Sequence, residues 1–222
     1  MTATPLPVVV LLSGSGSNLQ ALIDGQQAGE LAIDIRAVIS NRPGAYGLER
    51  ARAAGIHAET LDHREFADRE SYDTALRDRI EAREPGLVVL AGFMRILTDP
   101  LVEHFRGRML NIHPSLLPAF RGLHTHRRAL EAGHREHGCS VHFVIPALDA
   151  GPVVAQGVVP VLDDDTEDTL AARVQRQEHR VYPLVVHWYA TGRLRLEGET
   201  VMLDEQPLDA PARIVAEQPL PA

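Results

Sequence analysis

Two polar residues that could act on a substrate, Asn111 and His113, stand two positions apart in the segment Asn111-Ile112-His113-Pro114. In an extended chain residues i and i+2 share a face, so both side chains would enter the same cleft, and Pro114 would fix the exit of the chain. An amide donor beside an imidazole suits the stabilisation of an oxyanion. A structural histidine that caps the end of a strand is the alternative.

A carboxylate, Asp149, lies in the turn Leu148-Asp149-Ala150-Gly151-Pro152 between two apolar segments. If Asp149 is buried near His113, it would favour the charged imidazolium form of that residue and fix its tautomer. An Asp-x-Gly sequence is often only a turn. The pairing of Asp149 with His113 is therefore a hypothesis at this point.

A glycine-rich loop, Ser13-Gly14-Ser15-Gly16-Ser17-Asn18, follows the apolar run Val8 to Leu12 and precedes a helical pattern. Backbone N–H groups at a helix N-terminus, together with Ser and Asn side chains, would surround an anion. The loop lacks the Gly-Lys-Ser/Thr sequence of nucleoside triphosphate sites, and Leu19 replaces the third glycine of a dinucleotide site. The second predicted strand ends in Ser40-Asn41, where a dinucleotide site has an acidic residue. The ligand that remains for this loop is a single phosphate on a small molecule. The alternative is that the loop is only an ordinary strand-to-helix turn.

Histidines are concentrated in the second half of the chain, and His124-x-His126 could offer two metal ligands from an extended segment. Neither a His-Glu-x-x-His pattern nor a cysteine pair accompanies them, so we expect no metal. Solvated or hydrogen-bonded side chains are the alternative for these histidines.

The elements that must position these residues alternate between strand and helix over the first ninety residues. Apolar runs predict strands at Val8–Leu12, Ile33–Ile39, Ile56–Leu61 and Leu87–Leu90, and helical spacing predicts helices after Asn18, over Tyr46–Ala54 and around Tyr72–Ile80. This alternation predicts an α/β fold with a doubly wound, Rossmann-like, mostly parallel sheet that binds ligands at the carboxyl ends of its strands.

The second half of the chain has a different pattern, which predicts an antiparallel extension of the sheet. The predicted strands are Met109–Ile112, Cys139–Ile145 and Val153–Val161. A helix is predicted from Thr166 to about Ala190, after the acidic run Asp163-Asp164-Asp165, whose carboxylates suit a helix N-terminus. We expect one domain over 1–206, with a phosphate-binding half (1–92) and a catalytic half (93–206), and a loose, proline-rich tail over 207–222.

Composition restricts the class of protein. The 222 residues carry a net charge of −8 without charged blocks, which argues against nucleic-acid binding. The longest apolar run near the start, Val8–Leu12, is far shorter than the roughly 18 residues of a membrane helix, and no basic flank precedes it. Cys139, the single cysteine, cannot form a bridge within the chain. We expect a cytoplasmic protein, and an apolar face on the helix from Tyr72 to Arg83 would permit a homodimer.

Several motifs together resemble one family. They are Ser13–Asn18, Leu90-Ala-Gly-Phe-Met-Arg-Ile-Leu97, Asn111-Ile-His-Pro-Ser-Leu-Leu-Pro118, Gly122-Leu-His-Thr-His126, Gly138-Cys-Ser-Val-His142 and Leu148–Pro152. This set, which extends over about Val8 to Leu203, resembles the folate-dependent formyltransferases, and within them the phosphoribosylglycinamide formyltransferases of purine synthesis. Beyond Pro207 no resemblance is found.

The resemblance implies roles for individual residues. The ribonucleotide would be bound by Gly16, Ser17, Asn18, Gln175, Arg176, Gln177 and Glu178. The co-substrate 10-formyltetrahydrofolate would be bound by Arg69, Met94, Arg95, Ile96, Leu97, Asn111, Ile145, Pro146, Ala147, Leu148 and Asp149. The catalytic set would be Asn111, His113 and Asp149, and the resemblance implies no metal and no covalent enzyme intermediate.

Three other functions stay open from the sequence. A formyltetrahydrofolate hydrolase would share the three catalytic residues but usually has an added regulatory domain, whereas seven residues here precede the first predicted strand. A methionyl-tRNA formyltransferase would need a basic domain for tRNA. A non-catalytic binding module could keep the glycine loop while lacking Asn111, His113 or Asp149, and all three are present.

Overall fold

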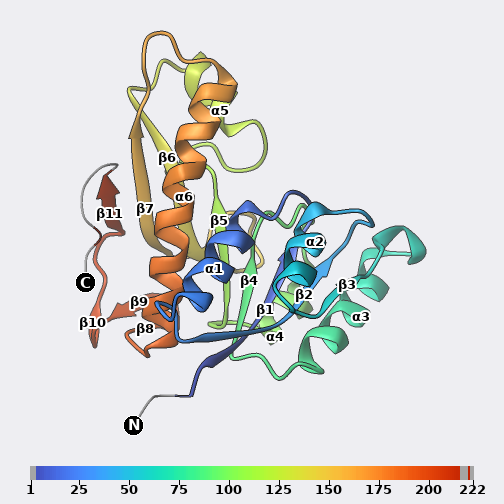
Figure 1. Cartoon of the computed structure of the whole chain (residues 1–222). Helices are drawn as coiled ribbons and strands as arrows, with labels where there is room; N and C mark the ends of the chain where they lie inside the picture. The colour runs from blue at the N-terminus through green and yellow to red at the C-terminus, as the bar shows by residue number, and fades with distance from the viewer. Residues whose placement is uncertain (1–3, 216–219, 221–222) are drawn as a thin grey trace. The chain divides into compact units, whose positions relative to one another are not determined.

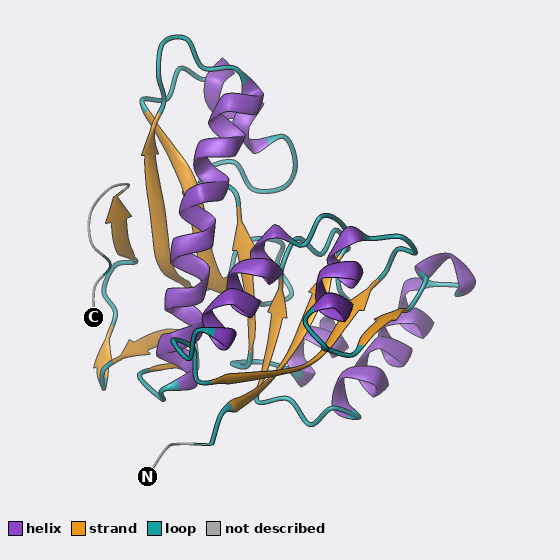
Figure 2. Cartoon of the chain, in the orientation of Figure 1, coloured by secondary structure: helices purple, strands orange, loops and turns teal. Residues whose placement is uncertain are grey.

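A computed structural model describes residues 4–215 and residue 220. The chain divides into two compact units, Met1–Asn111 and Ile112–Ala222. Figure 1 labels the elements, and Figure 2 distinguishes helices, strands and loops. The expected halves, 1–92 and 93–206, were defined by the ligands they would bind and stay a prediction.

The first unit is built on a parallel sheet. Its strands are β1 (Leu6–Leu12), β2 (Ile33–Ser40), β3 (Ala58–Thr60), β4 (Leu87–Leu90) and β5 (Met109–His113), whose last two residues belong to the second unit. They lie in the order β3-β2-β1-β4-β5, and every pair is parallel. Val8 to Leu12 and all of β4 are buried, as expected for strands covered on both faces.

The helices of the first unit connect these strands. They are α1 (Ser17–Gln27), α2 (Tyr46–Ala53), the short 3-10 helix η1 (His63–Glu65), α3 (Arg69–Glu81) and α4 (Asp99–His104). The chain moves from β1 to β3 in one direction and then returns to β4 on the other side of β1. Right-handed connections therefore put α1 and α2 on one face and α3 on the other. The reversal makes β1 and β4 the switch point where doubly wound sheets bind ligands.

The second unit combines an antiparallel strand pair with one long helix. Strands β6 (Glu136–Phe143) and β7 (Val153–Pro160) pair antiparallel, and α6 (Glu167–Ala190) packs along both of them (Figure 1). Helix α5 (Thr125–Glu131) also contacts α6. Cys139 is fully buried in β6, and burial raises the pKa of its thiol well above the ordinary value. The α/β class with an antiparallel C-terminal part is thus confirmed.

Small strands at the C-terminal side complete the second unit. Strands β8 (Leu194–Glu197), β9 (Thr200–Leu203) and β10 (Gln206–Pro207) form an antiparallel sheet. Strand β11 (Ala212–Val215) pairs in parallel with β7 and buries Ile214, whose carbonyl accepts a hydrogen bond from Gln177 Nε2 at 2.7 Å. Residues 212–215 are therefore an ordered strand and not part of a loose tail. The rest of the predicted tail, at 216–219 and 221–222, lies outside the described residues.

Other differences from the sequence-based expectations are local. Helices α4 and α5 were not predicted, because each is too short to show a clear helical period. The apolar residues Tyr72, Leu76 and Ile80 of α3 are fully buried, so they provide no exposed face for a homodimer. Within the described part of the chain, no helix is long and apolar enough to span a bilayer.

The N-terminus of α6 is fixed by two side chains that precede it. Thr166 is the N-cap residue and forms a capping box with Thr169. Asp165 accepts hydrogen bonds from the Leu162 N–H at 2.8 Å and from both terminal nitrogens of Arg173, at 2.5 and 2.8 Å. These bonds, above all those from Arg173, hold the pKa of Asp165 far below its usual range.

Replacing Asp165 by alanine should lower the free energy of unfolding by about 2 kcal/mol, since hydrogen bonds to a charged group are lost together. Chemical denaturation at neutral pH measures the change. Asp163→Ala is the matched control: its side chain is fully exposed, 3.7 Å from Arg135, and its loss should leave stability unchanged. Equal losses in both variants would contradict the assignment.

Candidate active site

The predicted phosphate loop occupies the expected place between β1 and α1. Gly16, the N-cap residue of α1, has a φ of 71°, and a Cβ on it would overlap Gly47 Cα. Glycine is therefore required at this position. The Gly47 N–H donates to the Gly14 carbonyl at 3.0 Å, which holds the loop against α2. The structure brings Gly16, Ser17 and Asn18 together at the positive end of the α1 dipole.

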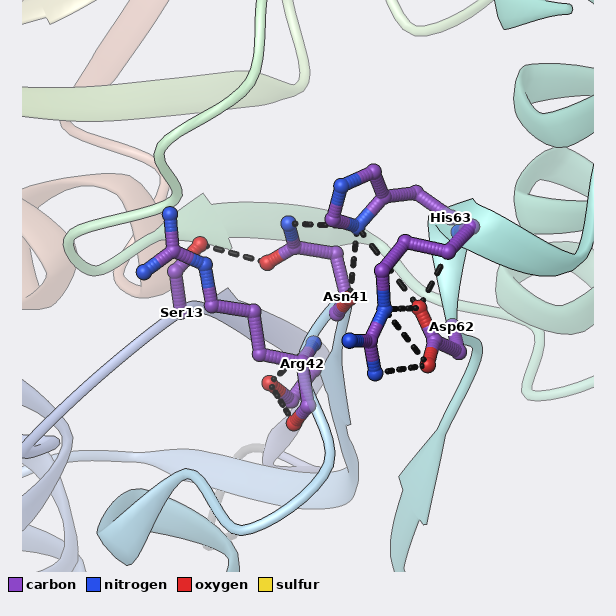
Figure 3. Close-up of polar contacts among 7 residues, drawn as sticks. Ser13, Asn41, Arg42, Asp62 and His63 are labelled. Carbon is purple, nitrogen blue, oxygen red and sulfur yellow. Dashed lines mark hydrogen bonds and ion pairs between the residues drawn. The ribbon is translucent and has the colours of Figure 1, made fainter.

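Ser13 joins this loop to the end of β4. Its N–H donates to the Gly92 carbonyl at 3.0 Å, and its hydroxyl accepts from the Met94 N–H at 2.8 Å. The same hydroxyl donates to Asn41 Oδ1 at 2.5 Å. Figure 3 shows this contact and the next one, in which His63 Nδ1 lies 2.9 Å from the Asn41 carbonyl. The ends of β1, β2 and β4 are thus tied together by buried polar groups.

The predicted folate-binding residues 94–97, which we call the wall segment, form a loop between β4 and α4. Met94 and Ile96 are 56% and 54% exposed, unusual for large apolar side chains, whereas Leu97 is buried. The Arg95 guanidinium carbon lies 4.4 Å above the Tyr72 ring. The segment therefore exposes two large apolar side chains to solvent. Arg69, at the first position of α3, is exposed.

In the second unit, His113 and Asp149 form the predicted pair. Asp149 Oδ2 lies 3.4 Å from His113 Nδ1, and the two side chains are only 9% and 7% exposed. The other ring nitrogen, Nε2, lies 3.0 Å from the Phe120 carbonyl oxygen. Both neighbours can only accept hydrogen bonds, so each ring nitrogen of His113 faces an acceptor. Asn111 lies two residues before His113 on β5.

The loop that follows β5 supports this pair, and its role could not be read from the sequence. Phe120 has a φ of 54°, which aims its carbonyl at His113, and the Gly122 N–H donates to Asp149 Oδ2 at 2.9 Å. Ser140 Oγ donates to the Ser115 carbonyl at 2.7 Å and accepts from the Leu117 N–H at 3.0 Å. His142 Nε2 lies 4.0 Å from Asp149 Oδ1. These contacts between residues distant in sequence fix both members of the pair.

The turn that carries Asp149 is the predicted folate-binding loop 145–149. Asp149 has a φ of 47°, and the Ala150 N–H donates to the Ala147 carbonyl at 3.3 Å. Leu148 is 51% exposed. A Cβ on Gly151 would overlap the Phe143 carbonyl oxygen, so glycine is needed where the turn meets β6.

The four consecutive residues predicted to bind the ribonucleotide on α6 do not share one orientation. Gln175 and Arg176 are exposed, whereas Gln177 and Glu178 are buried. Successive residues of a helix point about 100° apart, so four in a row cannot face one ligand. Gln177 donates to Ile214 and accepts from Arg180 Nη1 at 2.9 Å, which makes it a structural residue that holds β11.

Comparison with known proteins identifies the family of this chain. The model of the formyl transferase family matches residues 6–186. The chain belongs to the formyl transferase family. It is 55% identical over 201 residues to phosphoribosylglycinamide formyltransferase of Escherichia coli, covering 90% of this chain and 95% of that protein.

Two further relatives support the family assignment. The chain is 44% identical over 189 residues to the human trifunctional purine biosynthetic protein adenosine-3, covering 85% of this chain and 19% of that one. The solved structure of a phosphoribosylglycinamide formyltransferase from Coxiella burnetii matches with a TM-score of 0.91 and 51% identity, over 95% of this chain and 99% of that one. All the predicted catalytic residues lie inside the span matched by the formyl transferase family model.

Two histidines outside the predicted catalytic pair, His126 and His137, contact each other. His126 Nδ1 and His137 Nε2 lie 3.1 Å apart, and burial lowers both pKa values, that of His137 to about 4. His124, the N-cap residue of α5, is exposed. Among the residues described, no group of three or more His, Cys, Asp or Glu side chains could hold a metal ion.

Protonation of His137 should destabilise the fold. Its pKa is about 4 in the folded protein and about 6.5 in the unfolded chain, so only the unfolded chain takes up this proton between those values. The free energy of unfolding should therefore fall by about 3 kcal/mol as the pH drops from 6.5 to 4. Urea denaturation at several pH values measures this slope.

The His137→Gln variant should have a shallower dependence on pH over the same range. His57→Gln is the control, because the His57 side chain is 46% exposed and should leave the slope as in the wild type. A slope unaffected by His137→Gln would show that other groups cause the loss of stability.

Proposed function

We propose that this chain transfers the formyl group of 10-formyltetrahydrofolate to the amine of glycinamide ribonucleotide. The products are formylglycinamide ribonucleotide and tetrahydrofolate, in purine biosynthesis. The observation that carries the proposal is the His113 ring held between Asp149 and a carbonyl oxygen, in a chain of the formyl transferase family.

The reaction requires an oxyanion to be stabilised and one proton to be moved. The substrate amine attacks the formyl carbon and forms a C–N bond, the carbonyl oxygen becomes an oxyanion, and the bond to the folate nitrogen then breaks. One proton passes from the attacking amine to the departing nitrogen. Preorganised donors lower the barrier because they need no rearrangement as the charge develops.

His113 and Asn111 supply these donors in the proposed mechanism. His113 Nε2 lies 3.0 Å from the Phe120 carbonyl, and in the proposed mechanism its N–H exchanges this partner for the formyl oxygen when the donor binds. Asp149 keeps the imidazolium charged from the opposite side of the ring and assists the proton transfer, directly or through a water. No covalent enzyme intermediate is required.

The proposed binding residues lie on several elements of the structure. Gly16, Ser17 and Asn18 would bind the ribonucleotide phosphate at the N-terminus of α1, and Glu178 on α6 would contact its ribose and glycinamide end. The wall segment, Arg69 and the loop 145–149 would bind the formyl donor. The exposed apolar side chains of Met94 and Ile96 in the first unit suit a flat aromatic ligand, and the loop 145–149 of the second unit exposes Leu148.

The deciding experiment incubates the purified protein with 10-formyltetrahydrofolate and follows tetrahydrofolate with and without glycinamide ribonucleotide. We expect product only when the ribonucleotide is present. Product without the ribonucleotide would identify a hydrolase, and no product from folded protein would favour a non-catalytic binding module.

A further inference from the structure

The wall segment is fastened at both ends by side chains from other elements of the first unit. At its start, the Met94 N–H donates to Ser13 Oγ at 2.8 Å. Immediately after its end, the Thr98 N–H donates to Asp73 Oδ2 at 2.6 Å. The fastened stretch coincides with the residues proposed to receive the formyl donor. Its backbone position thus depends on acceptors outside the loop.

Asp73 is an unusual residue for this task, because it is a carboxylate in the protein interior. It lies on α3 between fully buried Tyr72 and exposed Thr74, and only 2% of its surface is exposed. Burying a carboxylate is unfavourable unless it is hydrogen-bonded or close to a positive charge. Burial raises the pKa of Asp73, while the Thr98 hydrogen bond and the charges of Arg95 and Arg69 act in the opposite direction.

The surroundings of Asp73 link it to the wall segment a second time. Its neighbour Tyr72 carries the Arg95 guanidinium over its ring, at 4.4 Å from the ring centre. Such a cation–π contact stabilises the side chain in this place. Helix α3 therefore holds the segment through the Thr98 backbone and through the Arg95 side chain.

We propose that Asp73 is a positioning residue for the formyl donor, which fixes the C-terminal end of the wall segment by accepting the Thr98 N–H. The inference rests on the proposed function. Asp73 itself touches no substrate: it acts by keeping Met94, Ile96 and Arg95 where the donor meets them. Loss of the acceptor loosens the segment and weakens donor binding, with little effect on the ribonucleotide or on the chemical step.

Asp73→Leu and Asp73→Asn test this role, since both side chains branch at Cγ as Asp does and only Asn keeps an acceptor. With Asp73→Leu, we expect the KM for 10-formyltetrahydrofolate to rise about tenfold or more, the range for a lost hydrogen bond to a charged group. The KM for the ribonucleotide and kcat at saturation should stay within about twofold. Asp73→Asn should bring the donor KM back to within about threefold of the wild type.

Amide hydrogen exchange gives a second readout that needs no substrate. The Thr98 amide should exchange about tenfold faster or more in Asp73→Leu and near the wild-type rate in Asp73→Asn. Asp78→Leu is the control on the same helix, because Asp78 is exposed and paired with Arg77 at 3.0 Å. It should change neither the exchange rate nor the kinetic constants.

Three results would overturn the inference: an unchanged donor KM in Asp73→Leu, an unchanged Thr98 exchange rate, or parallel losses for both substrates. If Asp73→Leu does not fold, Asp73→Ser is used in its place, because the shorter serine side chain does not reach the Thr98 N–H. The same three results would then overturn the inference. A wild-type protein that transfers no formyl group would refute the proposed function as well. If the wild type is active and Asp73→Leu has the same donor KM as the wild type, only the role of Asp73 is refuted.

Discussion

Replacing His113 by alanine should lower kcat by about a hundredfold to a thousandfold, the usual effect of removing one oxyanion donor. The ring has Nε2 3.0 Å from an oxygen acceptor and Nδ1 3.4 Å from a carboxylate, so its loss removes the donor that the proposed mechanism requires and leaves Asp149 without this partner. Asn111→Ala should have an effect of the same order. Steady-state kinetics with both substrates saturating measures the change.

His57→Ala is the control for this experiment, because the His57 side chain is half exposed, lies 3.6 Å from Glu59 and has no role in the proposed mechanism. It should retain wild-type turnover. Circular dichroism and thermal unfolding establish that the His113→Ala protein is folded. Near-normal turnover of that folded protein would remove His113 from the mechanism.

Replacing Asp149 by asparagine should lower kcat by about a hundredfold or more. The amide can still accept the Gly122 N–H, now 2.9 Å from Oδ2, but it lacks the negative charge that the proposed mechanism places beside His113. Loss of an orienting carboxylate in a comparable His–Asp pair of the serine proteases costs about ten-thousandfold, so the effect can be large without disrupting the fold.

The KM values of two variants distinguish the effect of the Asp149 charge from the effect of its hydrogen bond to the loop. Because the turn keeps its hydrogen bond, both KM values should stay within about threefold in Asp149→Asn. In Asp149→Ala the Gly122 anchor is also lost, and the donor KM should rise as well. Wild-type turnover in Asp149→Asn would show that the carboxylate charge takes no part in the reaction.

The sequence was sufficient to predict most regular elements of the first unit, because their signals are local. The β4 boundaries match the apolar run Leu87–Leu90, and the helix around Tyr72–Ile80 is α3. Helix α4, with six residues, was missed because it is less than two turns long. Strand β11 was missed because its partner β7 lies more than fifty residues earlier.

The candidate site was predictable to the extent that its residues are neighbours in sequence. Asn111 and His113 follow from the period of a strand, and Gly16 from the turn between β1 and α1. The supports of the site, Phe120 and Asp73, gave no such signal. Each residue acts through one hydrogen-bonding contact that only the tertiary structure creates. In the sequence, a single Asp in a helix usually indicates a solvent-exposed position, so Asp73 did not stand out.

The buried Cys139 in β6 can report on the opening of the second unit, because a thiol reagent reaches it only when that unit opens. Thiol reagents attack the thiolate, and the Cys139 side chain is both inaccessible and held in its thiol form. Because it is the only cysteine of the chain, all labelling must come from molecules in which the strand has separated from α6. The labelling rate therefore measures how often the second unit opens. A ligand that binds only the closed form would lower the labelling rate in proportion to its occupancy.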